Sequence, residues 1–498
     1  MQASIPHWID GKARDGQSGR YGAVFDPATG TQQARVAFAD SAEVDAAVDA
    51  ARAAFPAWRD TPITQRTQIL FRFRSGIEEA QEELAAVIAA EHGKTRPDAR
   101  GEVLRGLESV EFACGIAQLL KGENSVQVST GVDLASVREA LGVVGCITPF
   151  NFPAMVPLWM FPIAIACGNS VVLKPSEKDP SAANRLAELF AAAGLPDGVL
   201  NVLHGDRAAV EALIAHPDVA ALSFVGSTPV ARSIYQRGTE QGKRVQALGG
   251  AKNHMLVLPD ADLELAADAA VSAGYGSAGE RCMAISVVVA VGDAGERLVP
   301  LIEERVAKLR VGSAQDPEVE MGPLITGEHR DRVLGLVDSG VSEGATLVSD
   351  GRGLVVPGCE SGFFVGPTLF DRVEPQMQIY REEIFGPVLS VVRCERFTDA
   401  IDLVNANPYA NGTAIFTNDG GAARRFSREI EVGMVGINVP IPVPLGFYSF
   451  GGWKSSLFGA HSIYGEEGVR FYTRPKVITT RWPDPAHRGV DLGFPRSR

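Results

Sequence analysis

The sequence predicts a mixed α/β protein built on open parallel sheets, and three observations lead to this prediction. The chain has 498 residues, more than one hydrophobic core usually supports, which favours roughly two to four domains. The first hundred or so residues are rich in helical patterns. From about residue 137 onward, short β-branched runs alternate with helical runs. Alternation at this spacing is typical of parallel βαβ units.

The N-terminal part is predicted to contain three helical stretches. The first covers residues 41–55, where Ser41 is the expected N-cap and the apolar residues have a helical spacing. The second covers residues 65–91 and the third residues 99–120. We therefore expect this part to be mainly helical.

Two α/β blocks follow, and a β-rich tail ends the chain. In the first block we expect strands at 143–148, 170–174, 199–203 and 221–225, with helices at 155–166, 181–193 and 208–215 between them. In the second block we expect strands at 285–291, 388–392 and 412–416, and helices at 298–309, 331–342 and 398–405. Residues 468–482 are predicted to form a strand that needs a partner, from this or another subunit.

The composition is that of a soluble protein of a reducing compartment. The net charge of −13 disfavours binding to nucleic acid or to an anionic membrane. Residues 1–15 have no secretory h-region, and prolines and a glycine interrupt the most apolar run, 153–173, so no membrane span is expected. The six cysteines lie far apart without a CxxC pair, which predicts no disulfide framework, no metal site and a cytoplasmic location.

The first chemical motif is Gly279–Ala284, which reads Gly-Glu-Arg-Cys-Met-Ala. A cysteine is nucleophilic as the thiolate, and an adjacent cation such as Arg281 favours that form of Cys282. A lone cysteine beside an arginine is more often a buried structural residue. The motif is therefore a weak indication when it is taken alone.

The second motif is Ile147–Pro153, in which Asn151 follows a predicted strand and stands between Phe150 and Phe152. An asparagine fixed at a strand end can donate its amide N–H to an oxyanion. The alternative interpretation is an ordinary turn asparagine.

Three further motifs have the pattern of a dinucleotide site. Lys174 ends a predicted strand and Glu177 follows it, where a carboxylate can bind ribose hydroxyls and repel a ribose phosphate, which favours NAD over NADP. Gly226 and Ser227 lie between a strand and a helix start, where backbone N–H groups can hold a pyrophosphate. The last motif, Glu382–Val388, adds a carboxylate and an aromatic ring before a strand. Each of these is weak alone.

Together, in this order and spacing, the five motifs resemble the aldehyde dehydrogenase superfamily. The resemblance spans nearly the whole chain and implies that superfamily's fold: an open parallel-sheet NAD-binding domain, an α/β catalytic domain and a small β oligomerisation arm. It assigns residues 1–122 and 144–254 to the NAD-binding domain and 255–445 to the catalytic domain. It assigns 123–143 and 465–485 to the arm, and implies a homotetramer or homodimer.

The resemblance also implies roles for single residues. It makes Cys282 the nucleophile and Asn151 the oxyanion donor. It assigns Lys174 and Glu177 to the adenosine ribose, and Gly226 and Ser227 to the phosphate turn. It assigns Glu383 and Phe385 to the nicotinamide ribose, and Phe150 and Phe152 complete the cofactor-binding set. The family often has a second glycine five residues after Gly226, where this chain has Ala231.

An informative departure lies at residues 246–254. Hydrolytic members carry a glutamate there that activates water, whereas this chain has Ala247 or Leu248, depending on where one extra residue falls. Neither residue can accept a proton, so water lacks the general-base contribution of about 10²–10⁴. A thiol such as coenzyme A needs less help. This departure resembles the CoA-acylating methylmalonate/malonate-semialdehyde dehydrogenases, and so do the strings Glu102–Glu108, Arg281–Ala284, Ala251–His254 and Asn438–Pro444.

The substrates of that subfamily carry a carboxylate, and Arg105 and Arg281 are the residues expected to clamp it. Arg105 could instead be a solvated helix arginine, and Arg281 could serve only to tune Cys282. The resemblance implies NAD as cofactor, a small aldehyde and CoA as substrates, and acetyl-CoA or propionyl-CoA as product. The alternatives are a hydrolytic semialdehyde dehydrogenase, with a base such as Glu280, and a non-catalytic protein that kept the fold.

Overall fold

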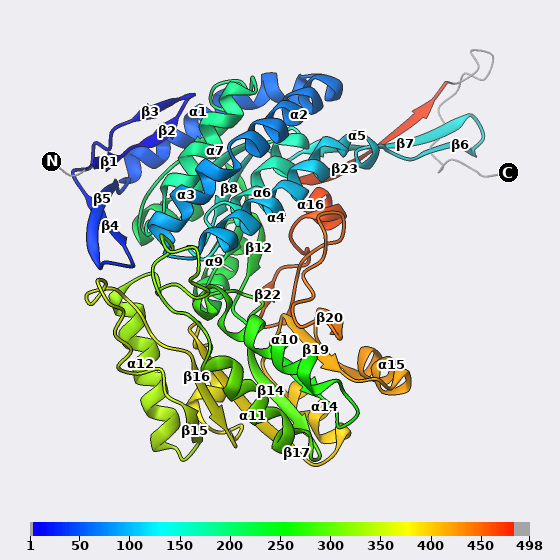
Figure 1. Ribbon diagram of the computed structural model, residues 1–498. Helices are drawn as coiled ribbons and strands as arrows, with labels where there is room; N and C mark the ends of the chain where they lie inside the picture. Colours follow the sequence, from blue (N-terminus) through cyan, green and yellow to red (C-terminus); the bar gives the residue numbers. More distant parts are fainter. Residues whose placement is uncertain (1–2, 483–498) are drawn as a thin grey trace.

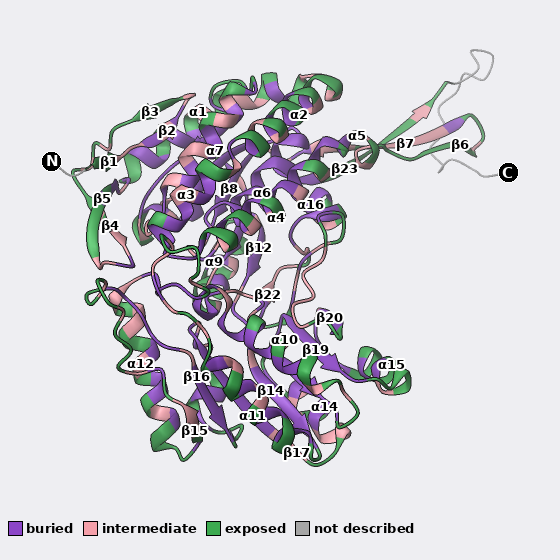
Figure 2. Cartoon of the chain, in the orientation of Figure 1, coloured by how far each residue is buried: buried purple, intermediate pink, exposed green. Residues whose placement is uncertain are grey.

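Two large sheets flanked by helices, and a narrow sheet projecting from them, make up residues 3–482, the part of the computed structural model described here (Figure 1). The first large sheet occupies the upper half of Figure 1 and the second the lower half. Their strands are almost entirely buried, whereas the outer faces of the helices and the projecting sheet are exposed (Figure 2). The mixed α/β class predicted from the sequence is the one observed.

The first large sheet has eight strands, and its five central strands are parallel. Its order is β22 (Leu457–Phe458), β12 (Arg244–Leu248), β11 (Val219–Val225), β8 (Val143–Ile147), β9 (Ser170–Lys174), β10 (Leu200–Val202), β2 (His7–Ile9) and β3 (Lys12–Arg14). The connecting helices are α6 (Met155–Ala166), α7 (Ser181–Ala192), α8 (Arg207–Ala215) and α9 (Thr228–Glu240). The order reverses beside β8, so the crevice at the carboxyl ends of β8 and β11 is a topological switch point, where such sheets bind ligands.

The second large sheet has seven strands, all parallel to their neighbours except β15. Its order is β15 (Thr346–Ser349), β16 (Thr368–Asp371), β17 (Val388–Cys394), β14 (Ile285–Val291), β13 (Asn253–Val257), β19 (Gly412–Phe416) and β20 (Met434–Ile437). Its helices are α10 (Leu263–Tyr275), η1 (Gly276–Gly279), α11 (Ala294–Val306), α12 (Gly327–Ser342), α13 (Gln378–Arg381), α14 (Phe397–Ala406) and α15 (Gly420–Glu429). The short pair β18 (Tyr409–Ala410) and β21 (Trp453–Lys454) lies outside it.

The N-terminal helices differ from prediction at their ends. They are α1 (Ser41–Asp60), α2 (Ile63–Glu79), α3 (Gln81–His92), α4 (Arg96–Cys114) and α5 (Ile116–Leu119), beside a small sheet of β1 (Ala3–Ile5), β5 (Thr31–Ala37) and β4 (Tyr21–Asp26). The N-cap of α1 is Asp40, which forms a capping box with Glu43, so Ser41 is the first helical residue. The stretch predicted at 65–91 is two helices, separated at Ala80.

The projecting sheet is formed by β6 (Asn124–Ser129), β7 (Val132–Ala140) and β23 (Thr473–Arg481). β23 pairs antiparallel with β7 along its whole length, so the chain itself supplies one partner for this strand. The predicted strand 468–482 was wrong in its first part, because Gly465–Tyr472 is helix α16, which packs on α6 through Gly468 and its neighbours. Residues 465–472 therefore belong to the body rather than to the projecting sheet.

The apolar run 153–173 contains α6, every residue of which is buried in the main core. Its neighbours are helices α2 and α4 and strands of the first large sheet. Within residues 3–482 no helix is long and apolar enough to cross a membrane. The run is thus explained by packing on all sides within the protein.

Candidate active site

Cys282 follows a strained turn in which the chain approaches the loop before β17. Ser277 and Ala278 have φ of 53° in this turn, a conformation that few non-glycine residues adopt. Gly279 follows with φ of 73°, and a Cβ there would lie 2.2 Å from the carbonyl oxygen of Gly386. The turn therefore requires glycine at 279 and brings the two loops into contact. A small cavity of about 20 Å³ lies between them. Its lining includes Asn253, Arg281, Cys282, Glu383 and Phe385.

Two asparagines hold the main chain of the candidate nucleophile. Asn253 Nδ2 donates to the carbonyl oxygens of Cys282 and Ala284, both at 3.0 Å, and its Oδ1 accepts from Gly412 N–H at 3.0 Å. Asn411 Nδ2 donates to the same Cys282 carbonyl at 3.3 Å. These asparagines fix the backbone that carries the thiol. Sequence reasoning assigned neither a role, although Asn253 stands in the string Ala251–His254.

The electrostatics of Cys282 differ from the expectation based on its neighbour in sequence. Burial, and after it the charge of Glu383, raises the pKa of the thiol to about 12. Arg281 acts in the opposite direction but more weakly. Its guanidinium pairs with Asp98, Nη2 to Oδ1 at 2.5 Å, which offsets its charge. Cys282 is therefore protonated in the ligand-free protein, and the expected activation by Arg281 is outweighed.

The main-chain carbonyl of Asn151 is held by a buried ion pair. Lys94 Nζ donates to the Asn151 carbonyl oxygen at 2.6 Å and to Glu102 Oε2 at 2.8 Å. Glu102 Oε1 accepts from the N–H groups of Ala154 and Met155 at the start of α6, at 2.8 and 3.1 Å. The Asn151 side-chain amide has no hydrogen-bond partner within residues 3–482, so its N–H groups are available to a ligand. Sequence reasoning assigned no role to Lys94 or Glu102, which hold the main chain around Asn151.

The residues predicted to bind adenosine lie at the carboxyl end of the first large sheet. Lys174 ends β9, and its Nζ donates to Glu177 Oε2 at 3.0 Å. Burial opposes ionisation of Glu177, but Lys174 and a backbone N–H lower its pKa overall. Gly226 follows β11, and Ser227 is the N-cap of α9 without a side-chain capping bond. The first N–H groups of α9 are therefore not capped by the serine and can bind an anion.

Glu383 and Phe385 meet the first large sheet from the second. Glu383 Oε1 accepts from Ala251 N–H at 2.8 Å, and a Cβ on Gly250 would lie 2.2 Å from Glu383 Oε2. Gly250 must therefore remain glycine for Glu383 to occupy this place. Phe385 has φ of 60°, and its ring meets that of Phe150 edge-on at 5.8 Å. The predicted cofactor-binding residues Phe150, Glu383 and Phe385 are thus brought close together.

Phe152 lies on the other side of Asn151 from Phe150 in the chain and has different neighbours. Its ring lies 4.4 Å from Lys94 Nζ, and it packs against the core cluster that also contacts Cys282. It therefore lies on the side of the buried ion pair. No contact places Phe152 beside Phe385, the residue that Phe150 meets.

The side chains of Ala247 and Leu248 point to opposite faces of β12. Leu248 belongs to the core cluster that contains Met283 and against which Cys282 packs. Ala247 belongs to a different cluster, with Phe224 on the opposite face of the sheet. Both side chains are buried. Both candidate positions are therefore apolar, and neither offers a side chain that can accept a proton.

Glu280 does not lie where a base for Cys282 chemistry is needed. Its Oε1 accepts from Ile325 N–H at 3.2 Å, and His329 and His92 lie 3.6 and 3.9 Å from its two carboxylate oxygens. Burial raises its pKa to about 8. It is absent from the lining of the cavity at Cys282. The geometry therefore disfavours Glu280 as the residue that activates water.

Helix α4 connects the two candidate carboxylate-binding arginines. Arg281 pairs with Asp98 of this helix, and Arg105 lies two turns further along it, about 10 Å away by helical rise. Arg105 Nη1 donates to both carboxylate oxygens of Glu108 at 2.8 Å. Both guanidinium groups are partly exposed and are neutralised by acidic partners. A carboxylate ligand could replace either partner.

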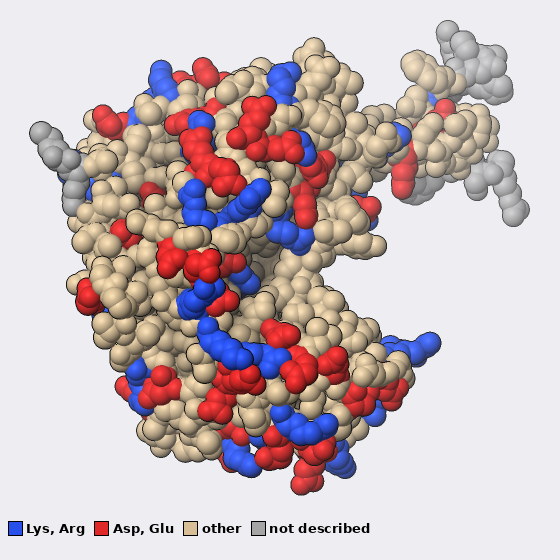
Figure 3. Space-filling model, in the orientation of Figure 1, with Lys and Arg blue, Asp and Glu red and all other residues tan. Residues whose placement is uncertain are grey.

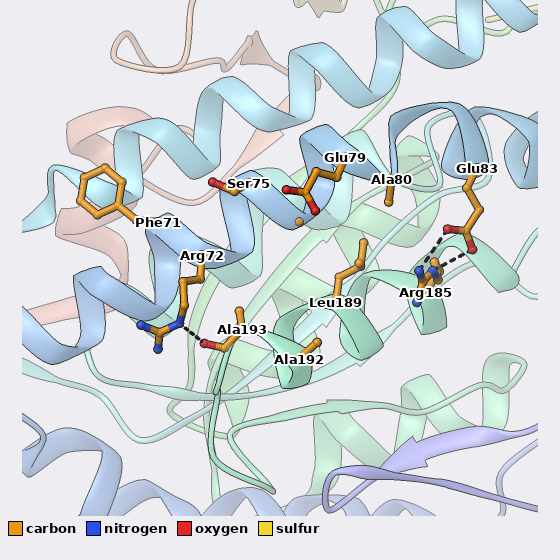
Figure 4. A pocket seen from close by; sticks show the side chains of 11 residues that line it. Phe71, Arg72, Ser75, Glu79, Ala80, Glu83, Arg185, Leu189, Ala192 and Ala193 are labelled. Atoms are coloured by element: carbon orange, nitrogen blue, oxygen red, sulfur yellow. Dashed lines mark hydrogen bonds and ion pairs between the residues drawn. The ribbon is translucent and has the colours of Figure 1, made fainter.

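Other surface features do not compete with this site. The face shown in Figure 3 mixes positive and negative side chains and is hollowed between its upper and lower parts. A separate groove of about 580 Å³ lies between α2 and α7 (Figure 4). Arg72 there donates to the Ala193 carbonyl and Arg185 pairs with Glu83, so its charged groups serve the packing of helices. Its lining contains no cysteine.

Comparison with known proteins identifies the architecture. A sequence model of the aldehyde dehydrogenase family matches residues 14–478. The chain belongs to the aldehyde dehydrogenase family. Malonate-semialdehyde dehydrogenase of Pseudomonas aeruginosa is 54% identical over 494 residues, 99% of each chain. The mitochondrial acylating methylmalonate-semialdehyde dehydrogenase of Arabidopsis thaliana is 48% identical, over 100% of this chain and 82% of its own length.

A solved structure agrees with this family membership. A crystal structure from Sinorhizobium meliloti 1021, described as a methylmalonate-semialdehyde dehydrogenase complexed with NAD, has a TM-score of 0.96 and 51% identity. It covers 97% of this chain and 99% of its own. The family and fold predicted from the five motifs are therefore confirmed.

Proposed function

We propose that the protein is an NAD-dependent, CoA-acylating dehydrogenase that converts malonate or methylmalonate semialdehyde to acetyl-CoA or propionyl-CoA with loss of CO₂. The observation that carries the proposal is that β12 offers only the buried apolar side chains of Ala247 and Leu248 at the place where hydrolytic enzymes of this family carry a glutamate. A hydrolytic enzyme needs a proton acceptor there. The names of the two curated relatives support the substrate class.

The residues fit bound NAD at three points. The uncapped start of α9 suits a pyrophosphate, the Lys174–Glu177 pair suits ribose hydroxyls, and Glu383 lies beside the cavity that Cys282 lines. A 2′-phosphate would be repelled by the carboxylate of Glu177, which favours NAD over NADP. When bound, NAD accepts the hydride from the substrate carbon.

In the first half-reaction the Cys282 thiol gives its proton to water, and the thiolate so formed attacks the aldehyde carbon. The free amide of Asn151 and the N–H of Cys282 supply the oxyanion donors in this proposal. The main chain of Cys282 keeps its position because Asn253 and Asn411 hold its carbonyl. Oxidation of the thiohemiacetal leaves an acyl thioester on the cysteine.

In the second half-reaction the carboxylate leaves before the thioester is cleaved. The electron pair of the bond to the carboxylate moves toward the thioester carbonyl, CO₂ departs, and the α-carbon takes up a proton. The CoA thiolate then attacks the carbonyl, and the Cys282 sulfur leaves. Neither Ala247 nor Leu248 can act as a base toward this thioester, so water competes poorly with the thiolate.

Arg105 and Arg281 are the proposed carboxylate-binding residues. In the ligand-free protein Glu108 and Asp98 neutralise them. Both acidic partners are partly exposed, so a substrate carboxylate can exchange with them without leaving a buried charge unpaired. An aldehyde without a carboxylate gains nothing from this exchange.

Product identification tests the proposal against the hydrolytic alternative. Enzyme, NAD and malonate semialdehyde are incubated with CoA in ¹⁸O-labelled water, and the products are identified by mass spectrometry. The proposal expects acetyl-CoA, with NADH and CO₂ formed in equal amounts. A free carboxylic acid carrying one ¹⁸O atom from the solvent would identify hydrolysis and overturn it.

We also propose the division of the chain into functional parts. Residues 1–122 and 144–254 hold the nucleotide, 255–445 carry Cys282 and Glu383, and 123–143 with the strand after residue 472 form an oligomerisation arm. Exposed Val126 and Val477 on that sheet support contact with other subunits, in a dimer or tetramer. The cysteines of the described chain are all unpaired, which suits a cytoplasmic protein.

A further inference from the structure

The carbonyl oxygen of Pro444 is shared by two side chains. Arg105 Nη2 donates to it at 3.1 Å and to the Val443 carbonyl at 3.2 Å. The Tyr464 hydroxyl donates to the same Pro444 carbonyl at 2.9 Å. Residues 438–450 thus form a strap that is attached to Arg105 on α4 and to Tyr464 beside α16. The place of the Arg105 guanidinium depends on the place of this strap.

Tyr464 is held firmly enough to fix the strap. Its side chain is 1% exposed, and its ring contacts those of Trp159 and Phe450 at 5.1 and 6.3 Å. Ser449 Oγ donates to the Tyr464 carbonyl at 2.8 Å. The φ of 46° at Tyr464 is unusual for a residue with a side chain, so the surroundings must impose this conformation. The hydroxyl therefore reaches Pro444 from a rigid base.

The electrostatic surroundings of the hydroxyl include both the arginine and Cys282. Burial raises the pKa of Tyr464 most strongly, Arg105 acts to lower it, and Cys282 acts to raise it. The phenol thus interacts electrostatically with both groups and remains a hydrogen-bond donor at neutral pH. The two strap carbonyls engage Nη2 of Arg105, and Glu108 engages Nη1. Nε, and Nη1 after Glu108 moves, remain for a carboxylate.

We propose that Tyr464 is a positioning residue that fixes the Pro444 carbonyl, and through it the guanidinium of Arg105, so that the enzyme prefers aldehydes bearing a carboxylate. This inference rests on the proposed function, because it assigns Arg105 to the substrate carboxylate. Without the hydroxyl, the Pro444 carbonyl keeps Arg105 as its one side-chain donor among the described residues, and the guanidinium is positioned less firmly against Glu108, the partner that competes with substrate. The aldehyde carbon and Cys282 are not directly affected.

The test compares Tyr464→Phe with the parent on two aldehydes of equal chain length, malonate semialdehyde and propanal. The variant keeps the ring contacts and loses only the hydroxyl. We expect kcat/KM for the semialdehyde to fall about tenfold, mainly through KM, since one hydrogen bond contributes of this order. For propanal we expect no change. Tyr448→Phe is the matched control, because Tyr448 lies on the same strap but is 67% exposed. This variant should leave kcat/KM unchanged for both substrates.

A double-mutant cycle isolates the route through the arginine. In an Arg105→Met background, adding Tyr464→Phe should not change kcat/KM further for either substrate. Malonate binding, measured by calorimetry on folded protein, gives a readout that needs no turnover, and it should weaken about tenfold in Tyr464→Phe for the same reason. Equal losses on both aldehydes would show that Tyr464 acts only in packing and would overturn the inference.

The failure of this inference and that of the proposed function are distinguishable. A parent enzyme that uses propanal as well as malonate semialdehyde would contradict the proposed function itself. A parent that strongly prefers the semialdehyde, with a Tyr464→Phe variant that keeps the full preference, would contradict only the role given to Tyr464. Unchanged malonate affinity in the variant would have the same meaning.

Discussion

Replacing Lys94 with methionine tests how the oxyanion residue is supported. The change removes the 2.8 Å ion pair with Glu102 and the 2.6 Å bond to the Asn151 carbonyl, and leaves a fully buried carboxylate. Removing one partner of a buried pair costs about 3–5 kcal/mol. Glu102 keeps its bonds from the N–H groups of Ala154 and Met155, so we expect the lower end of that range, about 3 kcal/mol.

This loss is measurable in the melting temperature and in turnover. For a unit of the size of the proposed NAD-binding domain, about 3 kcal/mol lowers the melting temperature by roughly 6–12 °C. An oxyanion donor is worth about 10²–10³ in kcat. Asn151 is displaced rather than removed, so we expect a smaller loss in kcat, of about tenfold. Calorimetry and steady-state kinetics measure the two effects, and Lys121→Met at the exposed Lys121 is the control, with neither effect expected.

The double variant Lys94→Met/Glu102→Gln separates the two consequences. Neutralising Glu102 removes the orphaned charge, so the double variant should melt at a higher temperature than Lys94→Met alone. Its kcat should stay low, because the Asn151 carbonyl still lacks its donor. A Lys94→Met variant that melts within about 2 °C of the parent would refute the assigned role of the buried pair. So would a double variant with restored turnover.

Three further predictions follow from the site. Leu248 and Ala247 point to opposite faces of β12, so only one of the variants Leu248→Glu and Ala247→Glu should place a carboxylate near Cys282 and give steady NADH formation without CoA, while the other remains dependent on CoA. Alkylation of Cys282 by iodoacetamide in the ligand-free enzyme should speed up about tenfold per pH unit between pH 7 and 10, because its pKa is raised to about 12. Asp98→Asn, which frees the neighbouring arginine, should make alkylation faster at every pH, and a flat pH profile would contradict this account. Burial raises the pKa of Glu280 to about 8, above its value in the unfolded chain, so the stability that it contributes is present at low pH and is lost as the pH rises through 8. The melting temperature of Glu280→Gln should therefore rise relative to the parent between pH 5 and pH 9, and a constant difference would show that the carboxyl does not titrate in that window.

The sequence predicted the sheets well because their strands are buried on both faces. Parallel strands of this kind appear as continuous β-branched runs, as β9 and β14 do, and they are followed by clear helical periodicity. The predictions failed where local pattern and tertiary packing disagree. Residues 468–472 are rich in bulky residues that suit a strand, but they form the end of α16 because its apolar face packs on α6.

The candidate site was predictable where a motif keeps its residues close in sequence. The support of Asn151 was not, since Lys94 lies 57 residues away and Glu102 carries no motif of its own that points to α6. The pKa of Cys282 was also beyond the sequence, because burial and Glu383, more than 100 residues away, outweigh the adjacent Arg281. That Ala247 and Leu248 point to opposite faces of the sheet became clear only from the structure.

The central claim is that the acyl-enzyme on Cys282 awaits a thiol rather than water. Mixing enzyme and NAD rapidly with malonate semialdehyde, and following NADH with and without CoA, tests it most directly. We predict one NADH per active site in a rapid burst without CoA, followed by turnover at least about 10²-fold slower than with CoA, the range of a missing general base. Steady turnover at the same rate in the absence of CoA would contradict the account.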